Sequence, residues 1–257
     1  MKRGVGYTAR TTAFATATGI TDTTILGALN TFDLGLISNN LDTKMKAVYP
    51  FVGGTSTTHK YNFFNPLDTN GAFRLSFNGG WTHSANGITG NLVNTFADTF
   101  FIPSAQLTLT SGHYSIYSRT NVNETSIDLG VLNVSVNNNV HQIITRLTDQ
   151  QTYSYASTNT GITLANTDSR GLYTLNRNSG TNTTAFKNAT KVVDAAMTAG
   201  LPSTSVFIGA RNQGGSGIIP SSRQYSFSSI GDGLTDGEAV IFYNLVQAMQ
   251  TTLSRNV

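Results

Sequence analysis

The chain contains only two glutamates, Glu124 and Glu238, and these are the first candidates for acid–base chemistry. Glycosidases use two carboxyl groups that lie roughly 5–5.5 Å or 6.5–9.5 Å apart. Glu238 follows Thr235 at the spacing of a capping box, which assigns its carboxylate to a helix N-terminus. Glu124 lies in a predicted turn at 121–125, where we expect a solvated side chain. The sequence therefore gives little support for a glycan hydrolase.

The four histidines are far apart in the sequence, and none has the spacing of metal ligands. They are His59, His83, His113 and His141. We expect each to be a hydrogen-bonded strand or loop residue. A nucleophilic serine in a strand–turn–helix motif of the type G-x-S-x-G is not recognisable. Because cysteine is absent, thiolate metal sites and disulfides are excluded. We therefore predict no metal, no cofactor and no catalytic residue.

Sugar binding needs an aromatic platform with amides and carboxylates close by, and one region offers this combination. The only tryptophan, Trp81, has Asn78, His83, Asn86 and Asp98 near it in the sequence. These five residues are our candidate ligand-binding set. The competing interpretation, which we favour, is that Trp81 packs in the core, because large aromatic side chains usually anchor cores.

Composition narrows the class of protein. Charged residues make up 11% of the 257 residues, and the formal net charge is +3. Lysines and arginines are scattered and form no run, which does not favour nucleic-acid binding. No apolar run approaches the ~18 residues of a membrane span, and residues 1–19 lack the apolar stretch of a signal peptide. Abundant Thr, Asn and Gly suit short strands joined by turns.

Alternating apolar residues predict a mainly β protein. The clearest hairpin is predicted at 106–119, where Leu107 and Leu109 alternate before a Ser-Gly turn and Tyr114 and Ile116 alternate after it. Further strands are expected at 72–77, within 91–101, and at 126–136, 140–147, 152–156, 171–176, 184–187, 206–210 and 224–230. This number of short strands, with turns between them, indicates a β-sandwich or jelly roll.

The end of the chain predicts one helix at 234–253. Thr235 and Glu238 mark its start, and Phe242, Val246 and Met249 lie on one apolar stripe. We expect this stripe to lie on the sandwich or on a partner.

The first 43 residues are predicted to form a separate attachment region before a sandwich at 44–257. Residues 1–20 are expected to be an extended arm, with a strand near 5–12 as one alternative. Thr21 or Asp22 can cap a helix at 22–41. Its stripe of Ile25, Leu29, Phe32 and Leu36 fits a short coiled-coil seam, and hence an assembly interface. The alternative is that this helix packs on its own domain.

Two resemblances give these patterns a context. The segments GLYTLNRNSGTNTTAFKNAT, VFIGARNQGGSG and YSFSSIGDGLTDGEAVIFYNLVQAMQ resemble the end of concanavalin A-like and laminin-G-like jelly rolls. Ala189 departs from the glycine that is usual in the hairpin after Phe186. The segments YPFVGGTSTTHKYNFFNP, FRLSFNGGWTHSANG and FADT are similar to structural proteins of tailed bacteriophages, including crAss-like phages.

These resemblances imply a non-enzymatic structural protein of a virion, such as a head fibre, decoration or tail protein. It would dock through its N-terminus onto other virion proteins, form a homo-oligomer and display a lectin-like sandwich. The alternative is a carbohydrate-binding module for host surface glycans, and a glycan hydrolase is a third hypothesis. Laminin-G-like domains also hold calcium, for which Asp98, Asp128 and Asp168 are candidates, although no spacing favours them.

Overall fold

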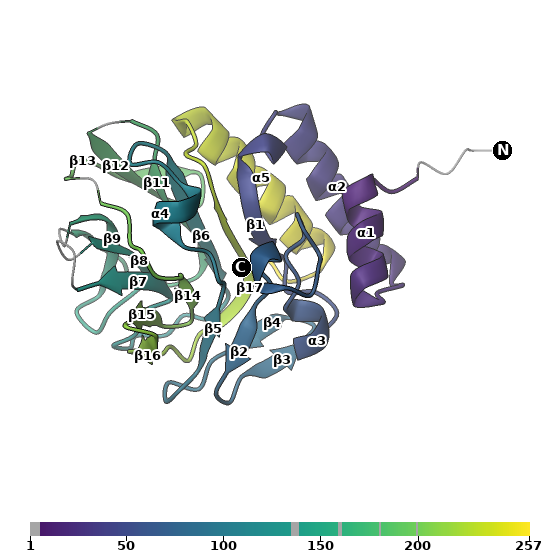
Figure 1. The fold of residues 1–257 in the computed structure, drawn as a ribbon, viewed down its shortest axis with the longest axis horizontal. Coiled ribbons are helices and arrows are strands. Elements are labelled where there is room, and N and C mark those ends of the chain that lie inside the picture. Colours follow the sequence, from purple (N-terminus) through teal and green to yellow (C-terminus); the bar gives the residue numbers. More distant parts are fainter. Residues whose placement is uncertain (1–5, 135–138, 159–160, 180, 199) are drawn as a thin grey trace.

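Two β-sheets face each other, and a layer of helices covers the outer side of one of them (Figure 1). The structure is a computed structural model, and it describes residues 6–134, 139–158, 161–179, 181–198 and 200–257. The helices are α1 (Ala9–Thr18), α2 (Thr23–Ser38), α3 (Ser56–His59), α4 (Pro103–Gln106) and α5 (Asp236–Thr252), with 3-10 turns at Asp42–Lys44 and Asn70–Ala72.

The helix-covered sheet has the strand order β13-β12-β11-β6-β17-β4-β3, and β1 also pairs with β17. Its neighbouring strands are antiparallel. The strands are β1 (Met45–Tyr49), β3 (Thr82–Ser84), β4 (Gly87–Thr89), β6 (Gly112–Ser118), β11 (Gly171–Arg177), β12 (Asn182–Lys187), β13 (Thr190–Ala196) and β17 (Gln224–Gly231).

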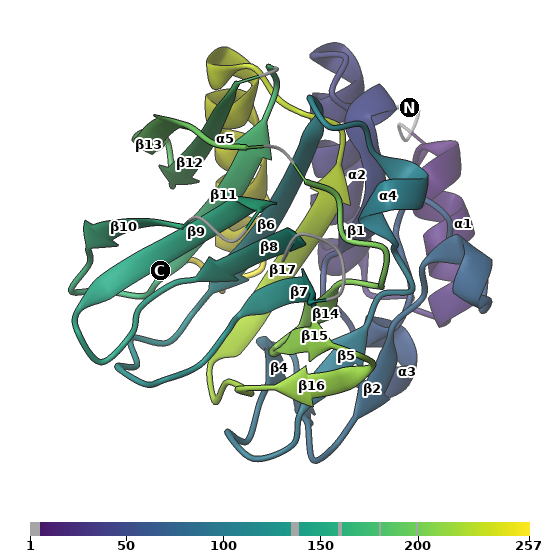
Figure 2. The same ribbon diagram turned by 60° about the vertical axis from the view of Figure 1, so that its left-hand side comes forward.

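The facing sheet has the order β10-β9-β8-β7-β14-β5-β2, and β15 lies parallel to β7 and pairs with β16 (Figure 2). Its strands are β2 (Ser76–Asn78), β5 (Phe96–Asp98), β7 (Leu129–Asn133), β8 (Asn139–Ile144), β9 (Gln151–Thr158), β10 (Ile162–Ala165), β14 (Phe207–Ile208), β15 (Arg211–Gln213) and β16 (Ser216–Ile218).

The alternation of side chains along β6 explains why the protein has two cores. Tyr114 and Ile116 point between the sheets and join the sandwich core, whereas Tyr117 points to the other side and joins a core beneath the helices. Since successive residues of a strand face opposite sides of the sheet, a strand covered on both sides is buried throughout. All seven residues of β6 are buried.

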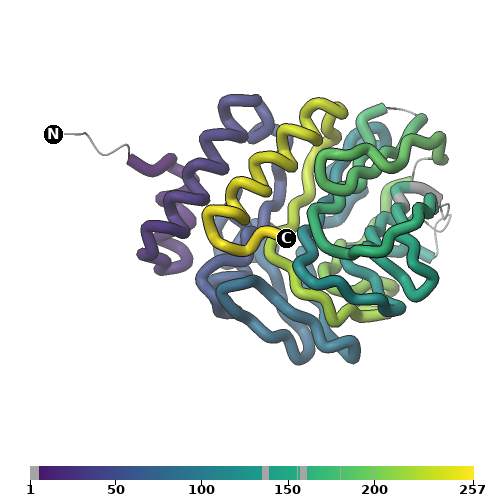
Figure 3. Tube along the Cα trace, turned by 180° about the vertical axis from the view of Figure 1, so that it is seen from behind, coloured from purple at the N-terminus to yellow at the C-terminus, as the bar shows by residue number. Residues whose placement is uncertain are grey.

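Helix α2 lies beside α5 on the outer face of the helix-covered sheet (Figure 3). The ring of Phe32 lies 5.8 Å from that of Phe227 in β17 and 6.5 Å from that of Phe242 in α5. Leu29 and Leu36 are fully buried in the same core. The stripe expected to form an assembly interface is therefore covered by the chain itself, and only Ile25 of that set is partly exposed.

The N-terminal region is helical where an extended arm was expected. Thr8 caps α1 by accepting a hydrogen bond from the Thr11 amide, and Gly19 ends it in the left-handed conformation at φ +70°. Phe14 is fully buried and stacks edge-on against Phe63. The prediction of a strand near 5–12 is wrong for residues 9–12, and residues 1–5 lie outside the described part of the chain.

The hairpin predicted at 106–119 has only its second strand. Pro103 at the first helical position starts α4, and Leu107 follows that helix in an extended conformation as its C-cap. β6 instead pairs with β11 and β17, which are distant in sequence. Residues 72–75 also lie outside a strand, because a 3-10 turn ends at Ala72 and Phe73 has φ +58°.

The C-terminal helix is confirmed. Thr235 and Glu238 form both hydrogen bonds of the capping box, and Phe242, Val246 and Met249 are buried against the sheet. The strands predicted near 126–136, 140–147, 152–156, 171–176, 184–187 and 224–230 correspond to β7, β8, β9, β11, β12 and β17. The turn at 137–139, which joins the strands predicted at 126–136 and 140–147, falls largely outside the described residues.

Candidate functional site

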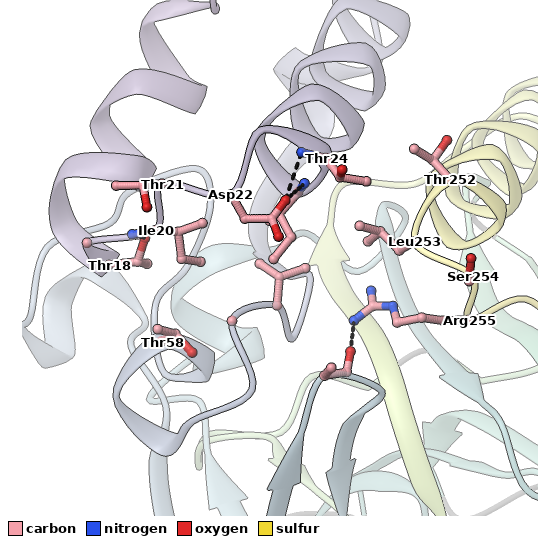
Figure 4. A pocket seen from close by; sticks show the side chains of 15 residues that line it. Thr18, Ile20, Thr21, Asp22, Thr24, Thr58, Thr252, Leu253, Ser254 and Arg255 are labelled. Carbon is pink, nitrogen blue, oxygen red and sulfur yellow. Dashed lines mark hydrogen bonds between the residues drawn. The ribbon is translucent and has the colours of Figure 1, made fainter.

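A groove of about 640 Å³ lies where the α1–α2 connection, the β1–α3 loop and the end of α5 meet (Figure 4). This size suits a small ligand. We call it the helix–loop groove. It is lined by Thr18, Gly19, Ile20, Thr21, Asp22, Thr24, Ile25, Val52, Gly53, Thr58, Ala85, Thr252, Leu253, Ser254 and Arg255.

Hydroxyl groups and aliphatic side chains share the lining of this groove. Its apolar side chains are those of Ile20, Ile25, Val52 and Leu253, together with the methyl group of Ala85. Threonine and serine hydroxyls supply most of the polar side chains. The groove thus offers both hydrogen-bonding groups and an apolar surface, but no aromatic side chain.

The wall formed by the α1–α2 connection depends on two helix caps. Gly19 ends α1 in the left-handed conformation. Asp22 then caps α2, because its Oδ1 accepts hydrogen bonds from the amides of Thr24 at 2.8 Å and Ile25 at 3.1 Å. Thr21 and Asp22, which lie between the helices, are exposed. The Asp22 carboxylate is therefore held in one place at the edge of the groove.

Arg255 fixes the opposite wall. It is only 2% exposed, and its guanidinium donates to the carbonyl oxygens of Phe51 (2.8 Å), Pro50 (2.9 Å) and Ser226 (3.1 Å). Nε donates to Gln250, and Nη1 makes a longer contact with the Ala85 carbonyl at 3.4 Å. Burial lowers the pKa of Arg255 to about 9, with a smaller contribution from Arg119. This arginine ties the C-terminus to β17 and to the β1–α3 loop.

The floor of the groove is shaped by the glycines of the β1–α3 loop. Gly53 has φ +88°, and a Cβ there would lie 2.8 Å from the Thr58 hydroxyl. Only glycine meets both conditions without strain. Thr55 and Thr58 form a capping box that starts α3, and the Gly54 amide donates to Nε2 of His59 at 3.2 Å.

His59 lies behind this floor and contacts His83 of β3. Their Nδ1 atoms are 3.0 Å apart, and the ring of His83 packs edge-on against Phe77 with centroids 4.6 Å apart. Burial, followed by the nearby His83 and Arg255, lowers the pKa of His59 to about 3. Burial also lowers the pKa of His83. The pair links the loop of the groove to the β3–β4 hairpin.

Of the predicted sugar-binding set, the structure brings Trp81 and His83 together around Phe77. The ring of Trp81 lies 6.1 Å from that of Phe77 and packs against the sandwich core. Its Cη2 lies 2.4 Å from where a Cβ on Gly209 would be, so the indole lies directly on the glycine backbone. This is the packing position that the sequence favoured for Trp81.

The other three members of that set are not joined to Trp81. Asn78 donates to the Ser76 carbonyl, and Asp98 accepts from the Phe100 amide at 2.8 Å. Asn86 is exposed in the β3–β4 turn, next to Ala85 of the groove. In the part of the chain that the structure describes, no hydrogen bond or ring contact connects Trp81 with any of these three.

Glu124 is buried, which corrects the expectation of a solvated loop residue. It is 7% exposed and accepts hydrogen bonds from the amide of Ser222 (3.0 Å) and from the hydroxyls of Ser221 and Ser222. Burial raises its pKa, but the hydrogen bonds from Ser222 and the charge of Arg223 outweigh burial, so the pKa is lowered. Glu124 alone of the turn at 121–125 is buried, because its carboxylate turns inward to Ser221, Ser222 and Arg223, which lies 3.6 Å away.

Asp128 completes this buried cluster. It lies 3.0 Å from Arg223, and it accepts hydrogen bonds from the Tyr225 hydroxyl at 2.6 Å and the Thr145 amide at 2.7 Å. Both Asp128 and Arg223 have 0% exposure. The charges of this cluster are paired within the core, and of the Arg223 donors only Nε has no hydrogen-bond partner among the described residues.

The remaining histidines have structural partners. His113 contacts the Asp232 carbonyl and the Ser229 hydroxyl, and His141 contacts the Tyr114 hydroxyl and the Gly200 carbonyl. Burial lowers the pKa of each to about 4. Among the described residues, no three His, Asp or Glu side chains lie close enough to share a metal ion. Of the calcium candidates, Asp168 pairs with Arg170.

Sequence reasoning missed the helix–loop groove because its residues come from five separate segments. The cap at Asp22 was recognised, but no pattern indicates that residues near 20, 53, 85 and 254 meet in space. The described helices also include none with the length and apolarity needed to cross a bilayer.

The architecture is that of a mainly β sandwich, and solved structures share it. Trypanosoma rangeli sialidase in complex with sialic acid matches with a TM-score of 0.52 and 8% identity, over 78% of this chain and 33% of that chain. The binding domain of botulinum neurotoxin DC in complex with rat synaptotagmin II matches with a TM-score of 0.53 and 9% identity, over 80% of this chain and 52% of that chain.

These likenesses establish the fold alone. This chain spans about a third of the sialidase and about half of the toxin domain. No protein-family model matches it, and no curated protein matches it significantly. The predicted fold class, a mainly β sandwich with an N-terminal arm and helix and a C-terminal helix, is confirmed, except that α1 forms where the arm was expected.

Proposed function

We propose that this protein is a non-enzymatic, lectin-like module that binds a glycan in the helix–loop groove. The observation that carries the proposal is the lining of the groove, where threonine and serine hydroxyls surround Ile20, Ile25 and Leu253. A sugar ring has hydroxyl groups at its edge and C–H groups on its faces, so it needs this combination of polar and apolar contacts. Hydroxyl-rich surfaces also bind well through bridging water.

Both glutamates are already engaged by other groups of the chain, which supports a binding role over hydrolysis. Glu238 is occupied by the α5 cap and by Lys44, and Glu124 is occupied by Ser221, Ser222 and the Arg223 charge. Most glycosidases use a carboxyl pair that faces the substrate, and sialidases, which use a tyrosine nucleophile, are an exception. Neither glutamate lines the groove.

A glycan array probed with the purified full chain tests the proposal. Thr21 is exposed and lines the groove, so Thr21→Trp should fill it and abolish the array signal. Thr16 is exposed on α1 outside the groove, and Thr16→Trp is the matched control that should bind as the wild type does. The proposal fails if no glycan binds, or if both variants bind equally well.

The second candidate is a structural component of a bacteriophage virion, as the sequence resemblance implies. The observation that favours it is the set of apolar side chains exposed on the helical layer: Leu34 (45%) and Ile37 (44%) on α2 and Ile241 (36%) on α5. In this hypothesis, the outer side of α2 contacts other virion proteins or a second copy of the chain, while its inner stripe remains in the core.

Incorporation into particles tests this second candidate. A double variant, Leu34→Glu with Ile37→Glu, should reduce the protein in purified particles by at least tenfold without changing its thermal midpoint by more than a few degrees. Leu164→Glu on β10 is the control, since Leu164 is also exposed (40%) but lies in the other sheet. Undiminished incorporation of the double variant would exclude this surface.

A further inference from the structure

We infer that the helix–loop groove selects neutral sugars over acidic ones, with the Asp22 carboxylate as the residue that binds a sugar hydroxyl. This inference rests on the proposed glycan-binding function and names the class of glycan. Four features of the groove carry it. One carboxylate is exposed, and the one arginine has no N–H left to donate. Several hydroxyl groups already donate their protons to backbone carbonyls, and two helices end at the groove with their C-termini.

Asp22 and Arg255 are the only charged side chains in the lining, and only Asp22 is exposed. Asp22 accepts the amides of Thr24 and Ile25 through Oδ1, and among the described residues Oδ2 makes no hydrogen bond. Oδ2 can therefore accept a hydrogen bond from a ligand. A hydrogen bond to a charged acceptor is worth more than one between neutral groups.

Arg255 cannot serve an acidic ligand. All three of its nitrogens donate to oxygens of the chain, namely the carbonyls of Pro50, Phe51, Ala85 and Ser226 and the side chain of Gln250. A guanidinium has five N–H donors, and these five contacts account for them. With Arg255 also 2% exposed, no cation in the groove faces an incoming carboxylate.

The hydroxyls of the groove favour ligands that donate hydrogen bonds. Thr18, Thr58 and Thr252 direct their protons to the carbonyl oxygens of Phe14 (2.7 Å), Thr55 (3.0 Å) and Ala248 (3.0 Å). The oxygens of Thr18 and Thr58 also accept the amides of Ile20 and Thr55, each at 3.3 Å, so each keeps one further lone pair for a ligand, and the oxygen of Thr252 keeps both. Sugar hydroxyls can donate to such oxygens, whereas an ionised carboxylate can only accept.

The charges at the helix termini also disfavour an acidic ligand. α1 and α5 both end at the groove, at Thr18 and Thr252, and a helix C-terminus carries about half a negative charge. α2 begins there, but Asp22 already occupies the amides of Thr24 and Ile25. The two helix C-termini and the exposed Asp22 carboxylate therefore place negative charge at the groove, while the one cation of the lining, Arg255, is buried, and this arrangement disfavours a ligand carboxylate.

Matched pairs of sugars test the inference. The probes are the methyl glycosides of glucose, galactose and mannose, each compared with its uronic acid, which differs only by a carboxylate in place of the C6 hydroxymethyl group. Ligand-observed NMR titration of the full chain at pH 7 should show at least one neutral sugar binding tenfold or more tightly than its uronic acid. Thr21→Trp should abolish this binding.

The variant Asp22→Asn tests whether the Asp22 carboxylate causes the preference for neutral sugars. Asparagine preserves the helix cap but removes the charge, so affinity for the neutral sugar should fall about tenfold and the preference over the uronic acid should narrow to threefold or less. Asp149→Asn is the matched control, because Asp149 is an exposed aspartate that caps the Gln151 amide away from the groove.

The outcomes separate the two proposals. If a uronic acid binds as tightly as its neutral partner, or if Asp22→Asn leaves the preference unchanged, the inference is overturned while glycan binding stands. If no sugar binds in the titrations and none binds on the array, glycan binding itself is wrong and the inference falls with it.

Discussion

The Nδ1 atoms of His59 and His83 lie 3.0 Å apart, although the two residues are 24 positions apart in sequence. Nε2 of His59 accepts the Gly54 amide, so the proton of a neutral His59 is on Nδ1 and points at Nδ1 of His83. Nδ1 of His83 must then be the acceptor. If His83 became an imidazolium, two donors would face each other, and the link between the β1–α3 loop and β3 would break.

Acid should destabilise the protein well before its carboxylates are protonated. The pKa of His59 is about 3 and those of His113 and His141 are about 4, each lowered mainly by burial, against about 6.5 in an unfolded chain. Because the unfolded state binds more protons between these values, the stabilisation is complete above pH 6.5 and decreases as pH falls toward 4. Between pH 7 and 5 the expected loss is about 2 kcal/mol for each of these histidines.

Chemical denaturation at a series of pH values checks this. In His59→Gln, the unfolding free energy should depend less steeply on pH between 7 and 5. The loss over this window should be smaller than in the wild type by the share of one histidine. A flat profile between pH 7 and 5 in the wild type would show that the buried histidines bind protons in the folded state.

Local features of the chain were predictable where short-range geometry decides them. The box of Thr235 and Glu238 and the cap at Asp22 depend on residues three positions apart or fewer, and both are confirmed. By contrast, alternation at 106–119 suggested a hairpin, but Pro103 starts a helix and β6 pairs with β11 and β17. Pairing between distant strands leaves no trace in local periodicity.

In the candidate site, too, local features were predictable and contacts between distant parts of the chain were not. The burial of Glu124 depends on Ser221, Ser222 and Arg223, which lie almost a hundred positions later in the chain. The apolar stripe with Phe32 was recognised correctly as a stripe. Periodicity alone could not tell whether its partner is this chain or another, and the structure places it against Phe227 and Phe242.

Replacing Arg255 by methionine should destabilise the fold strongly. The variant would leave the buried carbonyls of Pro50, Phe51 and Ser226 without donors, and each such group costs about 1–3 kcal/mol. We expect a loss of at least about 3 kcal/mol in urea denaturation. Arg170→Met is the control, since Arg170 forms an exposed pair with Asp168 that solvent screens and that therefore contributes little to stability. If the two variants lost the same free energy of unfolding, the hydrogen bonds of Arg255 would not be what holds the C-terminus to β17 and to the β1–α3 loop.

Asp128→Asn should unfold the protein more readily than any surface charge change. Arg223 would keep its buried charge without its 3.0 Å partner, and breaking a buried pair costs about 3–5 kcal/mol. Asp194→Asn, which removes an exposed partner of Lys191, should leave stability nearly unchanged, because solvent screens this pair. Midpoints of thermal and chemical denaturation measure both, and a cost below 1 kcal/mol for Asp128→Asn would argue against the buried ion pair.

Removing the cap of α5 should have a moderate effect. Thr235→Ala deletes the oxygen that accepts the Glu238 amide, at an expected cost of about 1 kcal/mol. Thr251→Ala, in the last turn of the same helix, should change stability by less than half of that value. Circular dichroism melting curves distinguish the two, and an unchanged midpoint for Thr235→Ala would show that Lys44 alone holds Glu238.

Trp81 provides the sharpest contrast between a packing role and a sugar platform. Its indole lies on Gly209, at φ +79°, and against Phe77. Trp81→Ala should therefore cost about 2–3 kcal/mol of stability through lost apolar contact, while glycan affinity measured at 15 °C on the folded fraction stays within twofold of the wild type. Gly209→Ala should destabilise as well, because a Cβ there would clash with the indole in a backbone conformation that favours glycine. A Trp81→Ala variant of unchanged stability that no longer binds glycan would move the sugar site from the helix–loop groove to the β2–β3 edge.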